Sequence, residues 1–223
     1  MSSPTLTDKV SKMIRQDILT GQLLPGQKLV VADLKSRYAV GASPIREALV
    51  QLSSDKYVKF KPQKGCWVSP VSVDELTEIF ESLRIVGRFL LEKSIQSGNE
   101  DWELKVLTSY HKLSRSLQTN LGQDLDIKLD EWDELHRQFH SALLSGSDSK
   151  IMFSFYLDLV DQLKRYDYIL LNKESIYIEH AKVIEDHEII MKAAFSGDTA
   201  KALEKLDAHS EDTLELLKKY INS

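Results

Sequence analysis

The chain has 223 residues, enough for two domains, and its single cysteine excludes an internal disulfide. Nine glycines and five prolines are too few for an all-β sandwich, and no apolar run approaches the ~18 residues that a membrane helix needs. The formal charge of −5 is unevenly spread: residues 1–70 carry 11 Lys and Arg against 5 Asp and Glu, whereas residues 71–223 have a net charge of −11. We expect a cytoplasmic protein without a membrane anchor, whose basic first module suits a polyanion.

Three short helices are predicted at the start of the chain. Hydrophobic periodicity indicates a helix over residues 7–20 that ends at Gly21, and the stretch LLPGQKL that follows is typical of a turn. A second helix is expected over residues 33–38, without a side-chain acceptor at its start. In ASPIREALVQL, Ser43 is suited to cap the third helix and Pro44 to occupy its first position.

The third helix is predicted to have one buried and one exposed face, and a hairpin follows it. The buried stripe is expected to contain Ile45, Ala48, Leu49 and Leu52. Residues 57–61 and 66–69 are expected to form two short strands around the loop 62–65. Three helices and a hairpin within ~70 residues are the outline of a winged helix-turn-helix, whose third helix enters the major groove of DNA.

The exposed face of that helix and the hairpin supply the candidate DNA-binding residues. Arg46 is suited to pair bidentately with guanine, although an ion pair with Glu47 or Asp33 is the alternative. Phosphate contacts suit Ser43, Lys61 and Lys64. Gly65 would let the hairpin turn close to the DNA backbone.

The remainder of the chain has no strand pattern. Ser72-Val73-Asp74-Glu75 is a capping box that opens a new helix. Helices are expected near 73–97, 101–121, 125–145, 150–171, 174–196 and 199–221. The fold is therefore predicted to be mainly α, with a winged helix-turn-helix in residues 1–70 and an all-α bundle of six or seven helices in residues 71–223.

Two histidines four residues apart, His136 and His140 in DELHRQFHSAL, share one face of a predicted helix. They are either polar residues at a solvated flank or two ligands of a metal. His187 and His209 lie in the last two predicted helices, so four imidazoles from three helices could converge inside the bundle. From the spacing alone, coincidence is the more frequent explanation.

With these motifs in this order, the chain resembles the GntR family of bacterial transcription regulators, and more narrowly its FadR subfamily. In the first module the resemblance rests on ILTGQLLPGQKL, SPIREAL and PQKGCWV, and in the second on FHSAL, EDHEIIMKAAFSGD and the late His209. It covers nearly the whole chain, with Ala32 and Ala42 where arginines are frequent in the family. It implies a homodimer that binds double-stranded operator DNA, more often as a repressor.

The resemblance also implies a metal centre in the helical bundle. His140, His187 and His209 match family ligand positions for a divalent metal ion, with zinc or nickel expected. The fourth ligand is expected to be His136, or Asp133 in its place.

A small carboxylic acid beside this metal is the effector that the resemblance implies. Arg84 matches a frequent family arginine and could bind the carboxylate with two hydrogen bonds. Arg165 and Tyr166 are looser matches to an effector site.

The function predicted is a transcription regulator, and two alternatives are a metal-dependent helical-bundle enzyme and a ligand-binding protein without a DNA role. A di-iron bundle needs two Glu-x-x-His pairs, whereas this chain has only Asp133-x-x-His136. The sequence contains no H-E-x-x-H, Walker or G-x-S-x-G motif. An enzyme is therefore not expected, and the basic first module disfavours a role without DNA.

Overall fold

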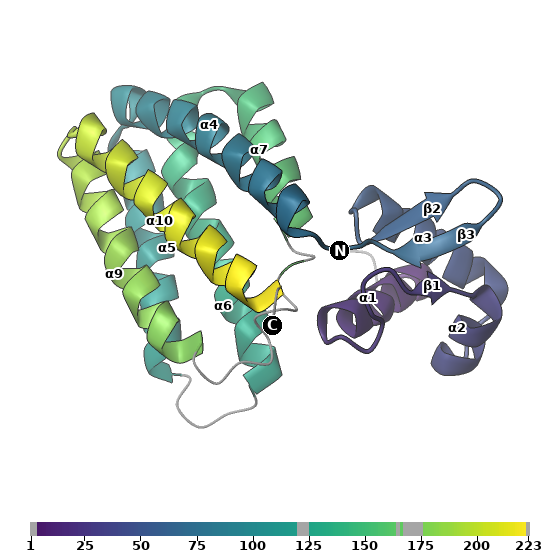
Figure 1. The fold of residues 1–223 in the computed structure, drawn as a ribbon. Coiled ribbons are helices and arrows are strands. Elements are labelled where there is room, and N and C mark those ends of the chain that lie inside the picture. The colour runs from purple at the N-terminus through teal and green to yellow at the C-terminus, as the bar shows by residue number, and fades with distance from the viewer. Residues whose placement is uncertain (1–3, 120–124, 164–165, 167–175, 222–223) are drawn as a thin grey trace. The chain divides into compact units, whose positions relative to one another are not determined.

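A computed structural model of the chain describes residues 4–119, 125–163, 166 and 176–221 (Figure 1). The chain divides into two compact units by its own contacts. Unit 1 comprises Met1–Leu76 and Val160–Leu171, and unit 2 comprises Thr77–Leu159 and Asn172–Ser223. Unit 1 therefore includes a segment near residue 166 that the sequence pattern assigns to the bundle.

Unit 1 contains three helices, α1 (Leu6–Leu19), α2 (Val31–Tyr38) and α3 (Ala42–Ser54), and an antiparallel sheet. The strands β1 (Lys28–Leu29), β2 (Val58–Lys61) and β3 (Gly65–Val68) lie in the order β1-β3-β2. The winged helix-turn-helix is thus confirmed. The prediction that the stretch LLPGQKL forms only a turn was wrong, because its last two residues pair with Trp67 and Cys66 of β3.

The core of unit 1 forms where the three helices and the sheet meet. Apolar residues at helical spacing face inward from each helix, and β2 and β3 contribute residues from one face of the sheet. The largest contributions come from Ile14, Ile45, Leu49, Leu52 and Tyr57. The only cysteine, Cys66, is buried in this core, and burial raises the pKa of its thiol to about 11.

The third helix begins earlier than the sequence suggests. Gly41 is the N-cap residue and α3 starts at Ala42, so the prediction of Ser43 as the cap and Pro44 as the first residue was wrong. The Ser43 hydroxyl donates to Glu47 Oε1 at 3.0 Å. Pro44 is tolerated in the first turn because the amide groups there have no partner within the helix.

Unit 2 and its connections are helical throughout the described residues. Six α-helices are present: α4 (Val73–Ser97), α5 (Glu100–Thr119), α6 (Leu125–Leu144), α7 (Lys150–Leu163), α9 (Ile176–Phe195) and α10 (Thr199–Ile221). A short 3-10 helix, η1 (Ser145–Ser147), follows α6. The helix predicted over 150–171 ends at Leu163, and Tyr166 donates its backbone N–H to Leu163 in a turn at 2.7 Å. In the described part of the chain no helix is long and apolar enough to cross a membrane.

Trp102 of α5 fixes the packing of three helices in unit 2. Its indole N–H donates to the Leu143 carbonyl of α6 at 3.1 Å, and its ring meets Phe195 of α9 edge-on at 5.7 Å. A Cβ atom at Gly98 would come within 2.4 Å of the Trp102 ring, so this position requires glycine. These contacts set α6 and α9 side by side with α5, and both helices carry histidines.

Candidate functional site

The exposed face of α3 presents Arg46 to solvent. Ile45, Ala48, Leu49 and Leu52 are buried, as the sequence predicts. Arg46 is exposed and has no hydrogen bond or ion pair with any residue that the structure describes. Glu47 accepts hydrogen bonds from Ser43 and from Thr7 of α1, at 3.0 and 2.8 Å. The ion pair that competed with a DNA role for Arg46 is therefore not formed.

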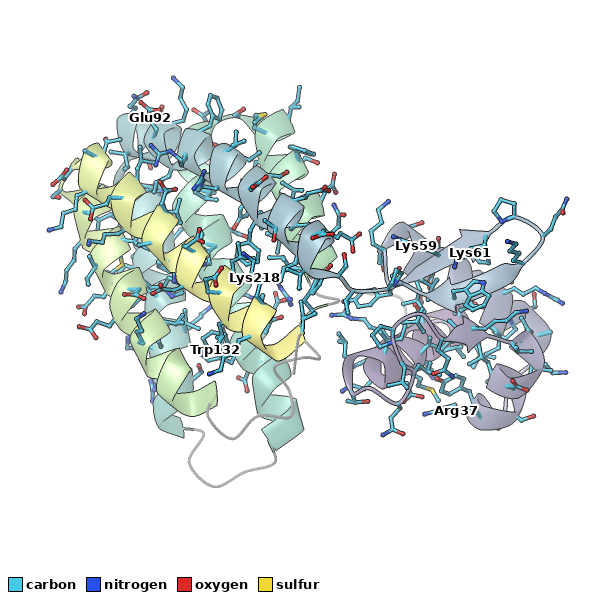
Figure 2. All side chains as sticks on the ribbon, viewed as in Figure 1. Arg37, Lys59, Lys61, Glu92, Trp132 and Lys218 are labelled. Atoms are coloured by element: carbon cyan, nitrogen blue, oxygen red, sulfur yellow. The ribbon has the colours of Figure 1, made fainter. Side chains whose placement is uncertain are left out.

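The hairpin of β2 and β3, called the wing from here on, carries Lys61 and Lys64 at its exposed end. Lys61 is opposite Gly65 in the antiparallel register, and Lys64 closes the turn by donating its backbone N–H to the Lys61 carbonyl at 3.0 Å. Gly65 has a φ of +100°, which L-amino acids rarely adopt. Figure 2 shows Lys59 and Lys61 on this hairpin.

Four histidines of unit 2 meet inside the bundle; we call them the histidine cluster. His136 and His140 come from α6, His187 from α9 and His209 from α10, and one ring nitrogen of each lies within 4.8 Å of the others. His140 Nε2 is 3.1 Å from His136 Nε2 and 2.9 Å from His187 Nε2. His187 Nε2 is also 3.2 Å from His209 Nε2. The sequence pattern and the resemblance therefore identified side chains that do converge.

Hydrogen bonding among the imidazoles cannot account for this arrangement. A neutral imidazole nitrogen has either one proton or one lone pair, and so makes one good hydrogen bond. Yet the Nε2 atoms of His140 and His187 each lie close to two other ring nitrogens. Nitrogens about 2.1 Å from one zinc ion are about 3.0 to 3.4 Å apart for bond angles between a right angle and a tetrahedral angle. The residues present therefore fit a single divalent cation.

Burial keeps three histidines of the cluster, His140, His187 and His209, in the neutral form that a metal requires. Desolvation, and then the neighbouring His209, lower the pKa of His140 to about 3. The pKa of His187 is lowered well below its usual value for the same reason, and that of His209 falls to about 4. These imidazoles thus offer lone pairs at neutral pH.

Asp133, the predicted substitute for His136, has another partner. Its carboxylate forms an ion pair with Arg137, which also contacts Glu134. His136 instead stacks on Trp132, with ring centroids 4.8 Å apart, and belongs to the cluster. The geometry favours His136 as the fourth candidate ligand.

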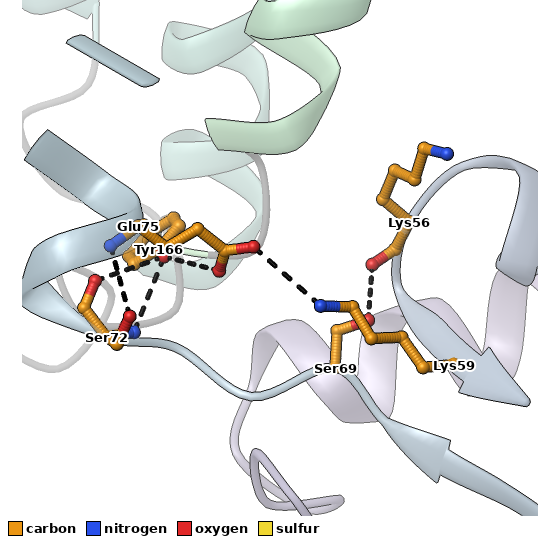
Figure 3. Close-up of polar contacts among 6 residues, drawn as sticks. All are labelled: Lys56, Lys59, Ser69, Ser72, Glu75 and Tyr166. Carbon is orange, nitrogen blue, oxygen red and sulfur yellow. Dashed lines mark hydrogen bonds and ion pairs between the residues drawn. The ribbon is translucent and has the colours of Figure 1, made fainter. Parts of the chain in front are cut away.

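Of the three predicted effector residues, the structure describes two, Arg84 and Tyr166, which belong to different units. Arg84 is exposed on α4 and has no ion pair with any described residue, and Arg165 lies outside the described residues. Tyr166 is fully buried in unit 1, where its hydroxyl donates to Glu75 Oε2 at 3.0 Å and accepts from the Ser72 backbone N–H at 3.4 Å (Figure 3). Lys59 Nζ lies 3.8 Å from Glu75 Oε1. Tyr166 thus holds the first turn of α4, and an effector role for it remains a prediction.

Comparisons with known proteins match two successive parts of the chain. The sequence profile described as "Bacterial regulatory proteins, gntR family" matches residues 6–68, and that of the FCD domain matches residues 78–212. The HTH-type transcriptional repressor GlaR of Escherichia coli is 33% identical over 89% of either chain. The chain belongs to the gntR family. As a member, it is a DNA-binding transcription regulator and not an enzyme, which confirms the function class predicted from the sequence.

Other members of the gntR family match over most of this regulator. The gluconate operon transcriptional repressor of Bacillus licheniformis is 24% identical, covering 92% of this chain and 82% of its own length. The solved structure of Escherichia coli McbR/YncC has a TM-score of 0.73 at 19% identity, covering 98% of this chain and 99% of its own. The latter likeness supports the fold alone.

Two residues of unit 1 that sequence reasoning missed lie beside the wing. Lys28 of β1 and Trp67 of β3 are paired across the sheet, and the Lys28 ammonium lies 5.7 Å from the centroid of the Trp67 ring. The period-two pattern of PQKGCWV could have placed Trp67 on the face opposite Cys66. No local signal could have placed Lys28 there, since its strand has only two residues.

Proposed function

We propose that this gntR-family regulator is a homodimeric repressor that releases its operator when a small carboxylic acid binds beside a metal ion. The observation that carries the proposal is that one chain holds both an exposed, unpaired Arg46 on α3 and a cluster of four converging imidazoles, of which His187 and His209 are buried. Such a protein would act in the bacterial cytoplasm, where it meets DNA. The relatives whose names include "repressor" support the direction of regulation.

Arg46 would contact the bases of the operator, and the lysines of the wing would contact its phosphates. An unpaired guanidinium can donate two hydrogen bonds to guanine O6 and N7 in the major groove. Ser43, Lys61 and Lys64 would contact the backbone and orient the module, and Gly65 would let the wing approach it closely. Two copies related by a two-fold axis would read an inverted repeat.

Exposed apolar side chains on two helices of unit 2 support dimerisation. Ile85 and Phe89 lie one turn apart on α4, and Ile151 and Phe155 lie one turn apart on α7. Ile85 is 68% exposed and Ile151 is 84% exposed, although burying apolar surface is favourable. A second copy would cover these residues, and sedimentation of Ile85→Glu and Ile151→Glu variants as monomers is the expected result.

The metal would be held by the histidine cluster, with zinc or nickel favoured by imidazole ligands. When bound, the ion would supply positive charge to an otherwise acidic domain, so a carboxylate could bind there. Arg84 is the residue of this chain proposed to bind the far end of the acid. A ligand releases DNA only if it binds more tightly to the form of the dimer that does not fit the operator.

Gel-shift assays with genomic fragments test the proposal. Wild-type protein should select one fragment at moderate salt, and a panel of mono- and dicarboxylic acids should include one that releases it. Arg84→Ala should raise the acid concentration needed for release without changing metal content or binding of DNA in the absence of acid. The absence of any preferred fragment would contradict the DNA-reading role. Equal acid affinity in metal-loaded and metal-stripped protein would contradict the metal-assisted site.

A further inference from the structure

One face of the sheet in unit 1 is basic, with an aromatic residue at its centre. The antiparallel register pairs Trp67 of β3 with Lys28 of β1 on one side and with Lys59 of β2 on the other. Directly paired residues point to the same face of a sheet, and Lys61 shares that face because it lies two residues after Lys59. The opposite face is buried through Leu29, Val58, Cys66 and Val68.

Two of these lysines lie against the indole ring. The Lys61 ammonium is 4.7 Å and the Lys28 ammonium 5.7 Å from the Trp67 ring centroid. Gly65 lies opposite Lys61 in the register, and its φ of +100° favours glycine there, whereas a Cβ atom would make only an ordinary contact with Lys28 Cε at 3.6 Å. A cation–π contact at an exposed site is weak, but two of them at one ring favour one position of each flexible side chain.

Neither ammonium has a counter-charge within the described residues. Lys59 is paired with Glu75, whereas Lys28 and Lys61 form no ion pair there. The indole nitrogen of Trp67 is buried and has no hydrogen-bond acceptor among those residues. Two cations held at one ring without an acidic partner are suited to bind an anion.

We propose that Lys28 and Lys61, positioned by Trp67, bind one backbone phosphate of the same DNA that α3 reads. This inference rests on the proposed function and adds a contact to it. Ammonium groups act as point charges toward phosphate and carry no base information, so the contact would strengthen binding to all sequences. Trp67 is a positioning residue, because its ring orders the two lysines. The sheet belongs to the same compact unit as α3.

The test measures how salt weakens the binding of full-length protein to a mixed-sequence duplex. Each phosphate contact contributes about 0.9 to the slope of log affinity against log salt concentration. Lys28→Ala and Lys61→Ala should each reduce the slope by part of this amount, because the other lysine still contacts the same phosphate, and the double variant should reduce it by about 0.9 in total. Lys12→Ala, an exposed lysine on α1, is the matched control and should keep the wild-type slope.

Two further variants test the role of the ring. Trp67→Phe keeps an aromatic face and should retain most of the slope, whereas Trp67→Ala should lower it as the lysine variants do. This comparison requires the Trp67→Ala variant to melt cooperatively. If it does not, the Trp67→Phe variant combined with Lys28→Ala is measured instead. A wild-type slope in the Trp67→Ala variant would overturn the assignment. So would a wild-type slope in a double variant that carries both Trp67→Phe and Lys28→Ala.

Two other results would contradict the shared site. A reduction of about twice 0.9 in the double variant would mean two separate phosphates. Inorganic phosphate that changes the Trp67 fluorescence as strongly as DNA does, at equal phosphate concentration, would mean a free-anion site rather than a DNA contact. If wild-type protein prefers one genomic fragment while Lys28→Ala keeps the slope, only this inference fails. If no fragment is preferred, the proposed function fails with it.

Discussion

The two units of this regulator use charged and titratable residues in opposite ways. In unit 1 the candidate residues are cations on the surface, and Arg46, Lys28 and Lys61 have no acidic partner among the described residues. In unit 2 the candidate metal ligands are histidines, of which His187 and His209 are almost completely buried. A polyanion binds to exposed, hydrated charges, which form few contacts within the free protein. A metal site buries its ligands, so water is kept away from them before the ion binds.

This difference decides which measurements respond to each site. Changes in unit 1 should alter affinity for DNA and its dependence on salt, with little effect on folding. Changes in the histidine cluster should alter the stability of unit 2, because the cluster is part of its core. The following predictions test that separation, beginning with the largest effect.

Metal removal should destabilise unit 2 more than any surface substitution. An ion present at a thousand times its dissociation constant stabilises the folded state by about 4 kcal/mol. His187→Ala combined with His209→Ala should abolish metal binding and make the melting temperature insensitive to a chelator. His111→Ala is the control, since His111 is exposed on α5 and outside the cluster. Unchanged metal content in the double variant, measured by elemental analysis, would refute the assignment.

Acid should destabilise the metal-free protein through the same residues. Because burial lowers the folded-state pKa of His209 to about 4, the unfolded chain binds more protons between that value and about 6.5. Stability is therefore complete above pH 6.5 and is lost as pH falls. His209 alone should cost about 2 kcal/mol at pH 5, and His140 and His187 shift in the same direction. Denaturant titrations of chelated protein at pH 7 and pH 5 measure the difference, which a His209→Gln variant should reduce.

Arg46→Ala should separate sequence reading from general DNA affinity. Loss of a bidentate contact to guanine costs about 1–3 kcal/mol for the preferred site. Binding to unrelated duplexes should fall far less, and the denaturation midpoint should remain that of the wild type because Arg46 is exposed. An equal loss for preferred and unrelated DNA, measured by fluorescence anisotropy, would instead identify a phosphate contact.

Tyr166→Phe should produce the smallest effect, a small loss in the stability of unit 1. The substitution removes the hydrogen bonds of a buried hydroxyl to Glu75 and Ser72, worth about 1 kcal/mol in net terms. Urea denaturation should show this loss, and Tyr110→Phe provides a partly exposed control. If the acid effector bound Tyr166 directly, the Phe variant would also weaken effector affinity, which calorimetry would detect.

Local pattern predicted most helices because each depends on residues near in sequence. The core stripe of α3 and the extent of α4, residues 73–97, agree with the hydrophobic period. The cap of α3 was misassigned because Gly41 and Ser43 are both acceptable caps, and only the path of the preceding loop selects between them. The strand β1 was missed because two residues, Lys28 and Leu29, are too few for a period-two pattern.

The sites were predictable to different degrees. Arg46 follows from the amphipathic pattern of one helix, whereas the convergence of His140 with His187 and His209 depends on how α6, α9 and α10 pack. The resemblance supplied that long-range information for the histidines. It supplied none for Lys28 and Trp67, whose pairing arises from strand register.

The burial of Cys66 provides a built-in reporter of local opening. It is the only thiol in the sequence and lies in the core of unit 1, with a pKa raised to about 11. A thiol reagent can modify it only when that core opens, so the labelling rate under native conditions measures the free energy of opening of unit 1. Unit 2 has no cysteine, so it does not contribute to the labelling. The same assay with operator DNA or metal added would show, without any engineered probe, whether each ligand protects the DNA-binding half of the chain.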